Sequence, residues 1–144
     1  MEKILLPVDG SNQAFRAGEW IVAISRKYGP LEVHVVNVEP QPIDWQIHGI
    51  ETEATKAHLM VRAHIAMKPV LHLLNEAGVK HSDHVELGEP GETIAALAEK
   101  FGCDTIVMGS RGLGAVTGLA LGSVGRKVLH LAKMPVVFVK TNNE

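Results

Sequence analysis

The stretch Asp104-Thr105-Ile106-Val107-Met108-Gly109-Ser110-Arg111-Gly112 decides the fold of this 144-residue chain. Its first part, through Met108, is an apolar run typical of a buried strand. Nine residues separate Gly112 from Gly122-Ser123, and an amphipathic segment follows over 124–131. Glycines between a strand and a helix are where an α/β protein places a phosphate-binding turn. The reason is that the first N–H groups of a helix are unpaired and its dipole is positive there.

Segments on both sides of this stretch alternate between strand and helix patterns. Continuous apolar runs such as 4–6 are typical of strands covered on both faces, and apolar residues three or four apart are typical of helices. The alternation predicts one α/β domain over 1–144, with a five-stranded parallel sheet in the order 3-2-1-4-5 and helices on both faces. The predicted strands are 3–8, 32–38, 79–87, 104–108 and 134–139, and the predicted helices are 12–28, 51–77, 90–101 and 123–132.

Details of these elements carry further expectations. Ser11 or Asn12 is expected to cap the first helix. Pro69 inside the long helix predicts a kink or two consecutive helices. The helical spacing places Tyr28 and Met60 among the inward-facing residues. The strand 79–87 is less apolar than the others, which favours a place at a sheet edge.

Composition narrows the class of protein. Hydrophobic residues make up 46% of the chain, which excludes disorder, and the net charge of −2 does not favour nucleic acid as a partner. The single cysteine, Cys103, cannot form an intrachain disulfide and suits a reducing compartment. No apolar run approaches the roughly 20 residues that span a bilayer, and the N-terminal run is too short for a secretory signal. We therefore expect a cytoplasmic protein that does not contact membranes.

The predicted strand order places a candidate site. The ends of the first and fourth strands lie side by side at the topological switch point, where open α/β sheets bind ligands. Asp9-Gly10 and 109–112 then face one crevice. Gly109 and Gly112 lack a Cβ atom, so backbone can approach a ligand and adopt positive φ. The N–H groups at Gly122-Ser123 and the serine hydroxyl can hold a phosphate without a lysine.

Two better-known phosphate motifs are absent from the sequence. Gly125-Arg126-Lys127 lies inside a helix and lacks the upstream spacing of a Walker A loop. Gly112-Leu113-Gly114 would need a third glycine at position 117, which is Thr117.

The sequence resembles the universal stress protein family over nearly its whole length. The family's nucleotide-binding pattern, Gly-x2-Gly-x9-Gly-Ser/Thr, is complete from Gly109 to Ser123, which implies the ATP-binding branch and its Rossmann-like, adenine nucleotide alpha hydrolase-like fold. The segments that carry the resemblance are Ile4-Leu5-Leu6-Pro7-Val8-Asp9-Gly10-Ser11, 33–38, Gly88-Glu89-Pro90, Met108-Gly109-Ser110-Arg111-Gly112, Leu121-Gly122-Ser123-Val124 and Pro135-Val136-Val137-Phe138-Val139.

The resemblance implies a ligand and a role for each site residue. The ligand is ATP, or ADP or AMP, with or without Mg²⁺. Its adenosine end is expected near the first strand, its adenine at the backbone of the second, its ribose at the fourth, and its phosphates at the glycine turn. The adenosine end is expected at Pro7, Val8 and Asp9, the adenine at Val38, and the ribose at Met108 and Gly109. The phosphates are expected at Gly112, Gly122, Ser123 and Val124. Arg111 either reaches the phosphates or is a solvated loop charge. The resemblance also implies a homodimer paired through the last strands, at Val136 to Val139, and an unidentified protein partner.

Other interpretations of the same residues remain open. The glycines can be ordinary loop glycines, and Asp9 can merely cap a helix. His81 and Asp83 lie on one strand face and His84 on the other, so this run alone makes no compact metal site. His58, His64 and His72 lack the i, i+4 spacing of a helical metal pair.

Three functions follow, in order of preference. The first is an ATP-binding regulator of a stress response, in which the nucleotide orders the loop 110–122. The second is a slow ATPase or nucleotide-transfer enzyme, which the sequence disfavours because it lacks a P-loop lysine and an evident general base. The third is an interaction module without a nucleotide. The loops 113–121 and 39–46 have no assigned role.

Overall fold

Strands and helices alternate along residues 1–41, 53–110 and 121–140, the part of the chain that the computed structural model describes. The strands are β1 Lys3–Pro7, β2 Glu32–Glu39, β3 Lys80–Leu87, β4 Thr105–Gly109 and β5 Val136–Val139, and the helices are α1 Asn12–Tyr28, α3 Glu53–Glu76, α4 Pro90–Lys100 and α5 Ser123–Leu131.

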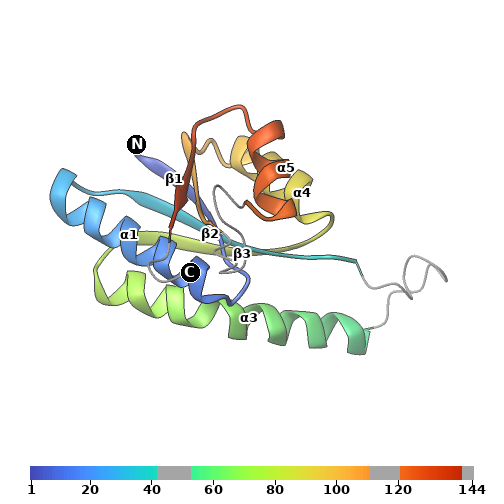
Figure 1. Ribbon diagram of the computed structural model, residues 1–144. Helices are drawn as coiled ribbons and strands as arrows, with labels where there is room; N and C mark the ends of the chain where they lie inside the picture. Colours follow the sequence, from blue (N-terminus) through green and yellow to red (C-terminus); the bar gives the residue numbers. More distant parts are fainter. Residues whose placement is uncertain (42–52, 111–120, 141–144) are drawn as a thin grey trace.

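The strands form one parallel sheet in the order β3-β2-β1-β4-β5, as predicted. Helices α1 and α3 cover one face of this sheet, and α4 and α5 cover the other (Figure 1). The predicted edge position of the third strand is confirmed, because β3 pairs only with β2 among the described strands. The alternating sequence pattern therefore predicted both the topology and the layers.

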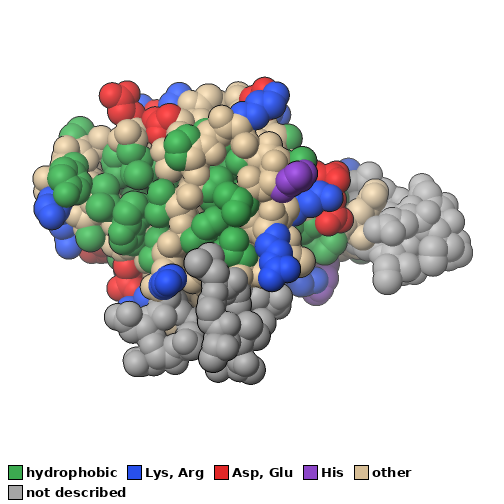
Figure 2. All heavy atoms as spheres, turned by 45° about the horizontal axis from the view of Figure 1, so that its top comes forward, with side chains coloured by type: hydrophobic (Ala, Val, Ile, Leu, Met, Phe, Trp, Pro, Cys, Tyr) green, Lys and Arg blue, Asp and Glu red, His purple; other side chains and the backbone are tan. Residues whose placement is uncertain are grey.

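The opposite edge of the sheet is β5, whose four residues are all partly exposed. Figure 2 shows hydrophobic side chains over much of the face that is turned to the viewer. Near the end of α5, Leu129 and Leu131 are 53% and 40% exposed. Among the described strands β5 pairs only with β4, so its other edge is open.

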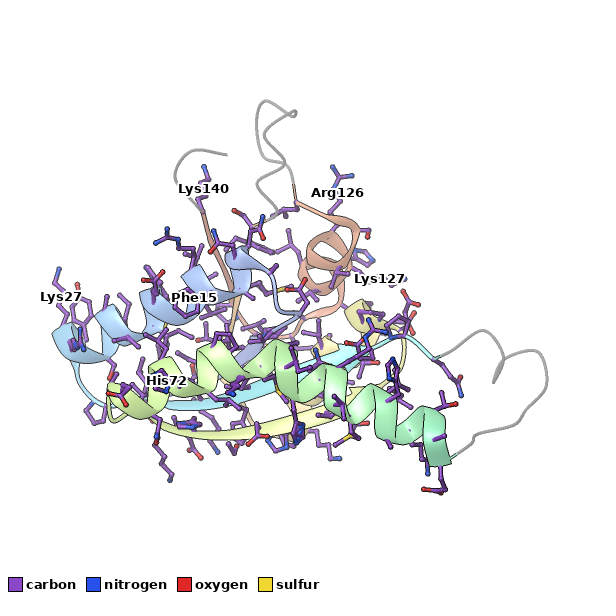
Figure 3. The ribbon with its side chains drawn as sticks, turned by 90° about the horizontal axis from the view of Figure 1, so that it is seen from below. Phe15, Lys27, His72, Arg126, Lys127 and Lys140 are labelled. Atoms are coloured by element: carbon purple, nitrogen blue, oxygen red, sulfur yellow. The ribbon has the colours of Figure 1, made fainter. Side chains whose placement is uncertain are left out.

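Both sides of the sheet have their own hydrophobic core, and β1 contributes to both. Ile4 and Leu6 pack with residues of α1 and α3, which lie side by side across one face (Figure 3). Leu5 points the other way and packs with residues of α4 and α5. Successive side chains of a strand alternate between faces, so a strand covered on both sides needs a continuous apolar run.

The turn between β1 and α1 is built by short-range hydrogen bonds. The Ser11 hydroxyl accepts from the N–H of Ala14 at 3.2 Å, which confirms Ser11 as the cap of α1. Asp9 lies before the cap, and its carboxylate accepts from the N–H of Ser11 at 2.9 Å. Gly10 has φ +87°, and a Cβ there would lie 3.3 Å from that of Ala66, so α3 packs directly against the turn.

Three details of the helices differ from the sequence predictions. Pro69 does not divide the long helix into two helices, because α3 is continuous, and the alternative of a kink stays a prediction. Pro69 is exposed, so the carbonyl group that its ring leaves unpaired is on the solvent side. Tyr28 and Met60 are 71% and 45% exposed rather than inward. Met60 follows buried Leu59 and is rotated about 100° from it, and Tyr28 is the last residue of α1.

Gly109 at the end of β4 does not adopt the positive φ that the sequence suggested. It is absent from the glycines with positive φ. A Cβ at this position would lie 2.5 Å from the carbonyl oxygen of Gln13, so β4 and the first turn of α1 touch backbone to backbone. The lack of a side chain therefore lets α1 pack closely against β4.

We predict that Gly109→Ala lowers the free energy of unfolding by about 1–3 kcal/mol, because neither backbone can yield easily. Urea unfolding followed by circular dichroism measures this loss. Gly18→Ala is the matched control: its new Cβ would meet flexible Leu73 and Val70 side chains at 3.3 and 3.5 Å, and alanine is favoured in a helix. Equal stability of Gly109→Ala and the wild type would contradict the prediction.

Candidate functional site

A cleft of about 610 Å³ opens where β1, β2 and β4 end and α5 begins. It lies at the switch point of the strand order, because β1 leads to β2 on one side and pairs with β4 on the other. The structure brings together in its wall every predicted site residue that it describes: Pro7, Val8, Asp9, Val38, Met108, Gly109, Gly122, Ser123 and Val124. Arg111 and Gly112 lie outside the described residues.

The β1 side of the cleft has a rigid backbone. The N–H of Val8 donates to the carbonyl of Val36 at 2.8 Å, and the Val8 carbonyl accepts from the side-chain amide of Asn37 at 2.9 Å. Asn37 is 1% exposed, and its Oδ1 has no partner among the described residues. Asp9 follows directly and is exposed at the cleft, where its carboxylate is held toward Ser11. The alternative that Asp9 merely caps the first helix is wrong, because the N-cap residue of α1 is Ser11.

The α5 side of the cleft is a helix N-terminus. Gly122 is the N-cap residue in extended backbone, and among the described residues no side chain caps the helix or places an acid in its first turn. The N–H groups of the first turn, at Ser123, Val124 and Gly125, have no acceptor within an α-helix. All three residues line the cleft. The partial positive charge of the helix end is therefore open to an anion.

Gly125, which the sequence prediction did not include, fixes the position of this helix end. A Cβ on Gly125 would lie 3.2 Å from the ring of Phe138 on β5. The close approach brings α5 down onto the sheet, and Phe138 also lines the cleft. The position of a glycine inside a helix pattern was the available sequence signal.

The charged pair Glu39–Arg62 was also missed from the sequence. Glu39 ends β2 and Arg62 lies on α3, and their side chains approach to 3.8 Å. Both line the cleft, where Arg62 is the only cation among the described lining residues. The Glu39 side chain is 16% exposed and that of Arg62 is 59% exposed. Arg62 is one helical turn before Ala66, so the contact between Ala66 and Gly10 brings it to the cleft.

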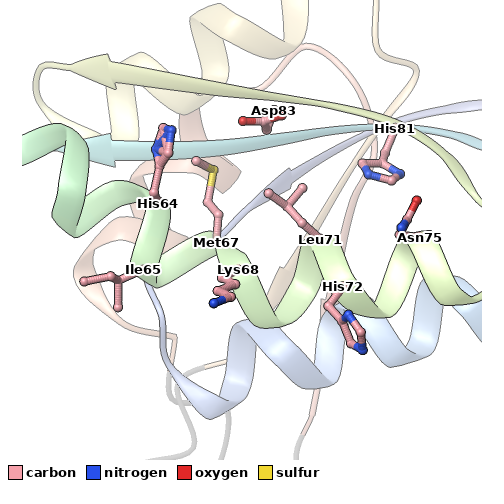
Figure 4. A pocket seen from close by; sticks show the side chains of 9 residues that line it. All are labelled: His64, Ile65, Met67, Lys68, Leu71, His72, Asn75, His81 and Asp83. Atoms are coloured by element: carbon pink, nitrogen blue, oxygen red, sulfur yellow. The ribbon is translucent and has the colours of Figure 1, made fainter.

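A second hollow, of about 540 Å³, lies between α3 and β3 (Figure 4). Its lining includes His81 and Asp83, while His84 lies on the other face of β3 beside His34 and Phe101. The predicted division of these side chains between two faces is confirmed. The described residues contain no group of three or more histidine, cysteine or acidic side chains placed to hold a metal. None of the predicted site residues lines this hollow.

The fold and the cleft together define a doubly wound, Rossmann-like α/β protein with a cleft at the switch point of its sheet. Comparison with known proteins makes the assignment specific. The model of the universal stress protein family matches residues 1–140, and the chain belongs to this family.

Similar sequences carry the same family name. A universal stress protein of Thermus aquaticus is 40% identical over 140 residues, covering 95% of this chain and 97% of the relative. The universal stress protein MJ0531 of Methanocaldococcus jannaschii is 32% identical over 146 residues, covering 96% of this chain and 82% of the relative.

Solved structures share the fold. The structure of protein MJ0577 of Methanocaldococcus jannaschii superposes with a TM-score of 0.82 at 31% identity, covering 99% of this chain and 98% of that one. The universal stress protein of Archaeoglobus fulgidus, solved in complex with dAMP, has a TM-score of 0.71 at 23% identity, covering 97% and 98%. A family protein from Arabidopsis thaliana, solved with AMP bound, has a TM-score of 0.73 at 19% identity, covering 99% and 94%. The last two likenesses show the fold.

We predict that Asn37→Ala lowers the free energy of unfolding by about 1–3 kcal/mol, because the buried Val8 carbonyl loses its donor. Chemical unfolding measures the change. Asn75→Ala, at an exposed position of α3, is the matched control and should stay within about 0.5 kcal/mol of the wild type. A similar small effect for Asn37→Ala would show that the Asn37–Val8 hydrogen bond does not organise the cleft wall.

Proposed function

We propose that the cleft binds an adenine nucleotide, ATP or else ADP or AMP, and that the bound nucleotide serves as a regulatory ligand in a stress response. The observation that carries the proposal is the uncapped N-terminus of α5, which faces Asp9 and the end of β1 within one cleft. The described wall offers apolar side chains for a base and free N–H groups for phosphates. Family proteins solved with AMP, dAMP or cAMP support the same ligand class.

The proposed pose follows from the chemistry of the wall. Phosphates belong at Gly122, Ser123 and Val124, where the helix N–H groups are unpaired. The base belongs at the other end, where the backbone of Val38 and the side chain of Met108 border the cleft. Asp9 is then placed to accept from a ribose hydroxyl.

Several observations favour binding over rapid turnover. In the described part of the wall the acids are Asp9 and Glu39, and Glu39 is already paired with Arg62. Lys127 pairs with Glu92 at 3.6 Å, and Arg126 points outward (Figure 3). Neither of these two cations lines the cleft. Phosphoryl transfer relies on a positioned nucleophile and on cations at the phosphates, so slow hydrolysis is the alternative to test.

The direct test is nucleotide binding by calorimetry, after mass spectrometry of any nucleotide released on denaturation. We predict that Gly122→Val weakens ATP binding at least tenfold, because the new side chain stands where phosphates would approach the helix N–H groups. Glu76→Val, at the exposed end of α3, adds the same side chain away from the cleft and should bind like the wild type.

The absence of binding at millimolar ATP would contradict the proposed function and favour an interaction module that uses no nucleotide. Steady phosphate release near the ordinary enzymatic range of about 1 s⁻¹ or faster would instead favour an ATPase.

We further propose that the protein is a homodimer joined through β5, whose apolar edge is open in the described chain. We predict a sedimentation mass twice the 15.6 kDa of one chain, and a shift toward the monomer in Val137→Lys. Val61→Lys, at an exposed position of α3, is the control and should leave the mass unchanged. A monomeric wild type at tens of micromolar would contradict this assembly.

The location of the protein and its other partners are further parts of the proposal. No helix in the described residues is long and apolar enough to cross a membrane. The net charge of −2 offers no general attraction for nucleic acid. A cytoplasmic regulator that acts on a protein partner accords with both observations.

A further inference from the structure

Two histidines meet across neighbouring strands, away from the nucleotide cleft. His34 on β2 and His84 on β3 lie on the sheet face that α4 covers, and His34 Nδ1 is 3.1 Å from His84 Nε2. The hydroxyl of Ser82, which is opposite His34 in the strand register, is 3.2 Å from each of these nitrogens. The ring of Phe101, at the end of α4, stacks on both imidazoles, with centroids 4.9 and 4.2 Å away.

The geometry of the two rings indicates a shared proton. The planes differ by only 17°, and the centroids are 5.4 Å apart while the nitrogens are 3.1 Å apart. The nitrogens therefore lie between the rings and point at each other, which is the geometry of an N–H···N hydrogen bond. Ligands of a metal would instead converge on a third point.

Proton counting shows what this contact tolerates. When both imidazoles are neutral, one ring supplies the N–H and the other the bare nitrogen. One added proton leaves that pattern intact. A second added proton puts an N–H on each facing nitrogen, so the hydrogen bond is lost and two positive charges stand 3.1 Å apart.

The surroundings of His34 oppose its protonation. The Nε2 atom of His34 is buried with no hydrogen-bond partner among the described residues. Burial first, and then the neighbouring His84, lower the pKa of His34.

Charged groups approach from several elements. On β2, Glu32 lies 3.8 Å from His34 Nε2 and favours the protonated ring, but Lys80 of β3 stands 3.9 Å from that carboxylate. Lys3 of β1 opposes protonation, and Lys100 of α4 lies 5.8 Å above the Phe101 ring. Cys103, after α4, stays neutral because burial raises the pKa of its thiol to about 11.

Of the elements joined by this contact, β2 and α4 also line the cleft. On β2, Val36 lies two residues beyond His34 and lines the cleft. On α4, Pro90 and Ile94 line the cleft, and Phe101 is the C-cap residue of the same helix. We propose that His34, Ser82, His84 and Phe101 form an acid-sensitive latch that ties β2 to β3 and α4, and that protonation of both imidazoles releases this wall of the cleft. The consequence for nucleotide affinity rests on the proposed function, whereas the latch itself does not.

The direction of the pH effect follows from the lowered pKa of His34. Its pKa in the unfolded chain is about 6.5, above that of the folded state, so below this pH the unfolded chain binds more protons. The stabilisation by the neutral latch is therefore complete above about pH 6.5. It is lost as the pH falls through the folded pKa.

The test compares thermal unfolding, without nucleotide, at about pH 8 and about pH 5. The variants are the double variant His34→Gln/His84→Gln, which keeps hydrogen-bonding groups but cannot titrate, and the control His72→Gln at an exposed position of α3. We expect acid to lower the melting temperature of the wild type and the control by roughly 3–5 °C more than that of the double variant. An equal fall in all three would overturn the latch.

A second measurement keeps the test decisive if the double variant does not fold. Imidazole NMR signals of the wild type should show coupled, two-step titration of His34 and His84. Independent titration of both rings near pH 6.5 would overturn the proposal.

Nucleotide binding separates the latch from the proposed function. ATP affinity is measured at about pH 8 and at about pH 5.5 for the wild type and the double variant. The fall in affinity on acidification should be about tenfold larger in the wild type. Protonation of ATP itself affects both proteins equally, so the double variant corrects for it. An equal fall in both would overturn the link between the latch and the cleft. No binding at either pH would contradict the proposed function, while the melting temperatures would still decide the latch.

Discussion

Burial of β1 on both faces is the constraint on which the rest of the structure depends. Ile4, Leu5 and Leu6 are fully buried and alternate between two hydrophobic cores. Burying one such side chain contributes about 1.5–3 kcal/mol, so the strand is stable only with a neighbour on each side and helices above and below. The chain leaves this enclosed strand at Val8 and Asp9, between the ends of β2 and β4. The cleft is thus where the central strand emerges from its two cores.

The cleft combines fixed backbone dipoles with few titratable side chains. Its donors are the N–H groups that begin α5, and its charged pair Glu39–Arg62 is largely self-compensating. Such a wall can recognise an anion without promoting a reaction, which is the physical basis for proposing a regulatory ligand. The glycines of the wall also serve packing. Gly109 admits the backbone of Gln13 and Gly125 admits Phe138, so a substitution there alters the scaffold together with any ligand contact.

Sequence patterns predicted the parts of the site that follow from strand order. Asp9 and Gly109 lie far apart in the chain, yet parallel strands of known order end at the same edge, so their meeting could be foreseen. Arg62 could not be foreseen, because its place depends on how α3 docks against the turn at Gly10. The helical spacing also placed Met60 inward wrongly. Met60 is apolar like the buried residues of α3, but its position around the helix axis turns it toward solvent.

The contact between His34 and His84 shows the same limit. The pattern of β3 separated His84 from His81 and Asp83 by face, but the partner of His84 depends on the register between β2 and β3 and on the end of α4. A period of two fixes the face on which a side chain lies, but it does not distinguish registers that differ by two residues. For this protein, the sequence by itself determined the order of strands, the two-sided core and the meeting of Asp9, Gly109 and Gly122 at one edge of the sheet, because these depend on local periodicity and general rules of connection. The tertiary structure alone decided which side chains face one another across elements, because distances between elements depend on how whole helices and strands pack.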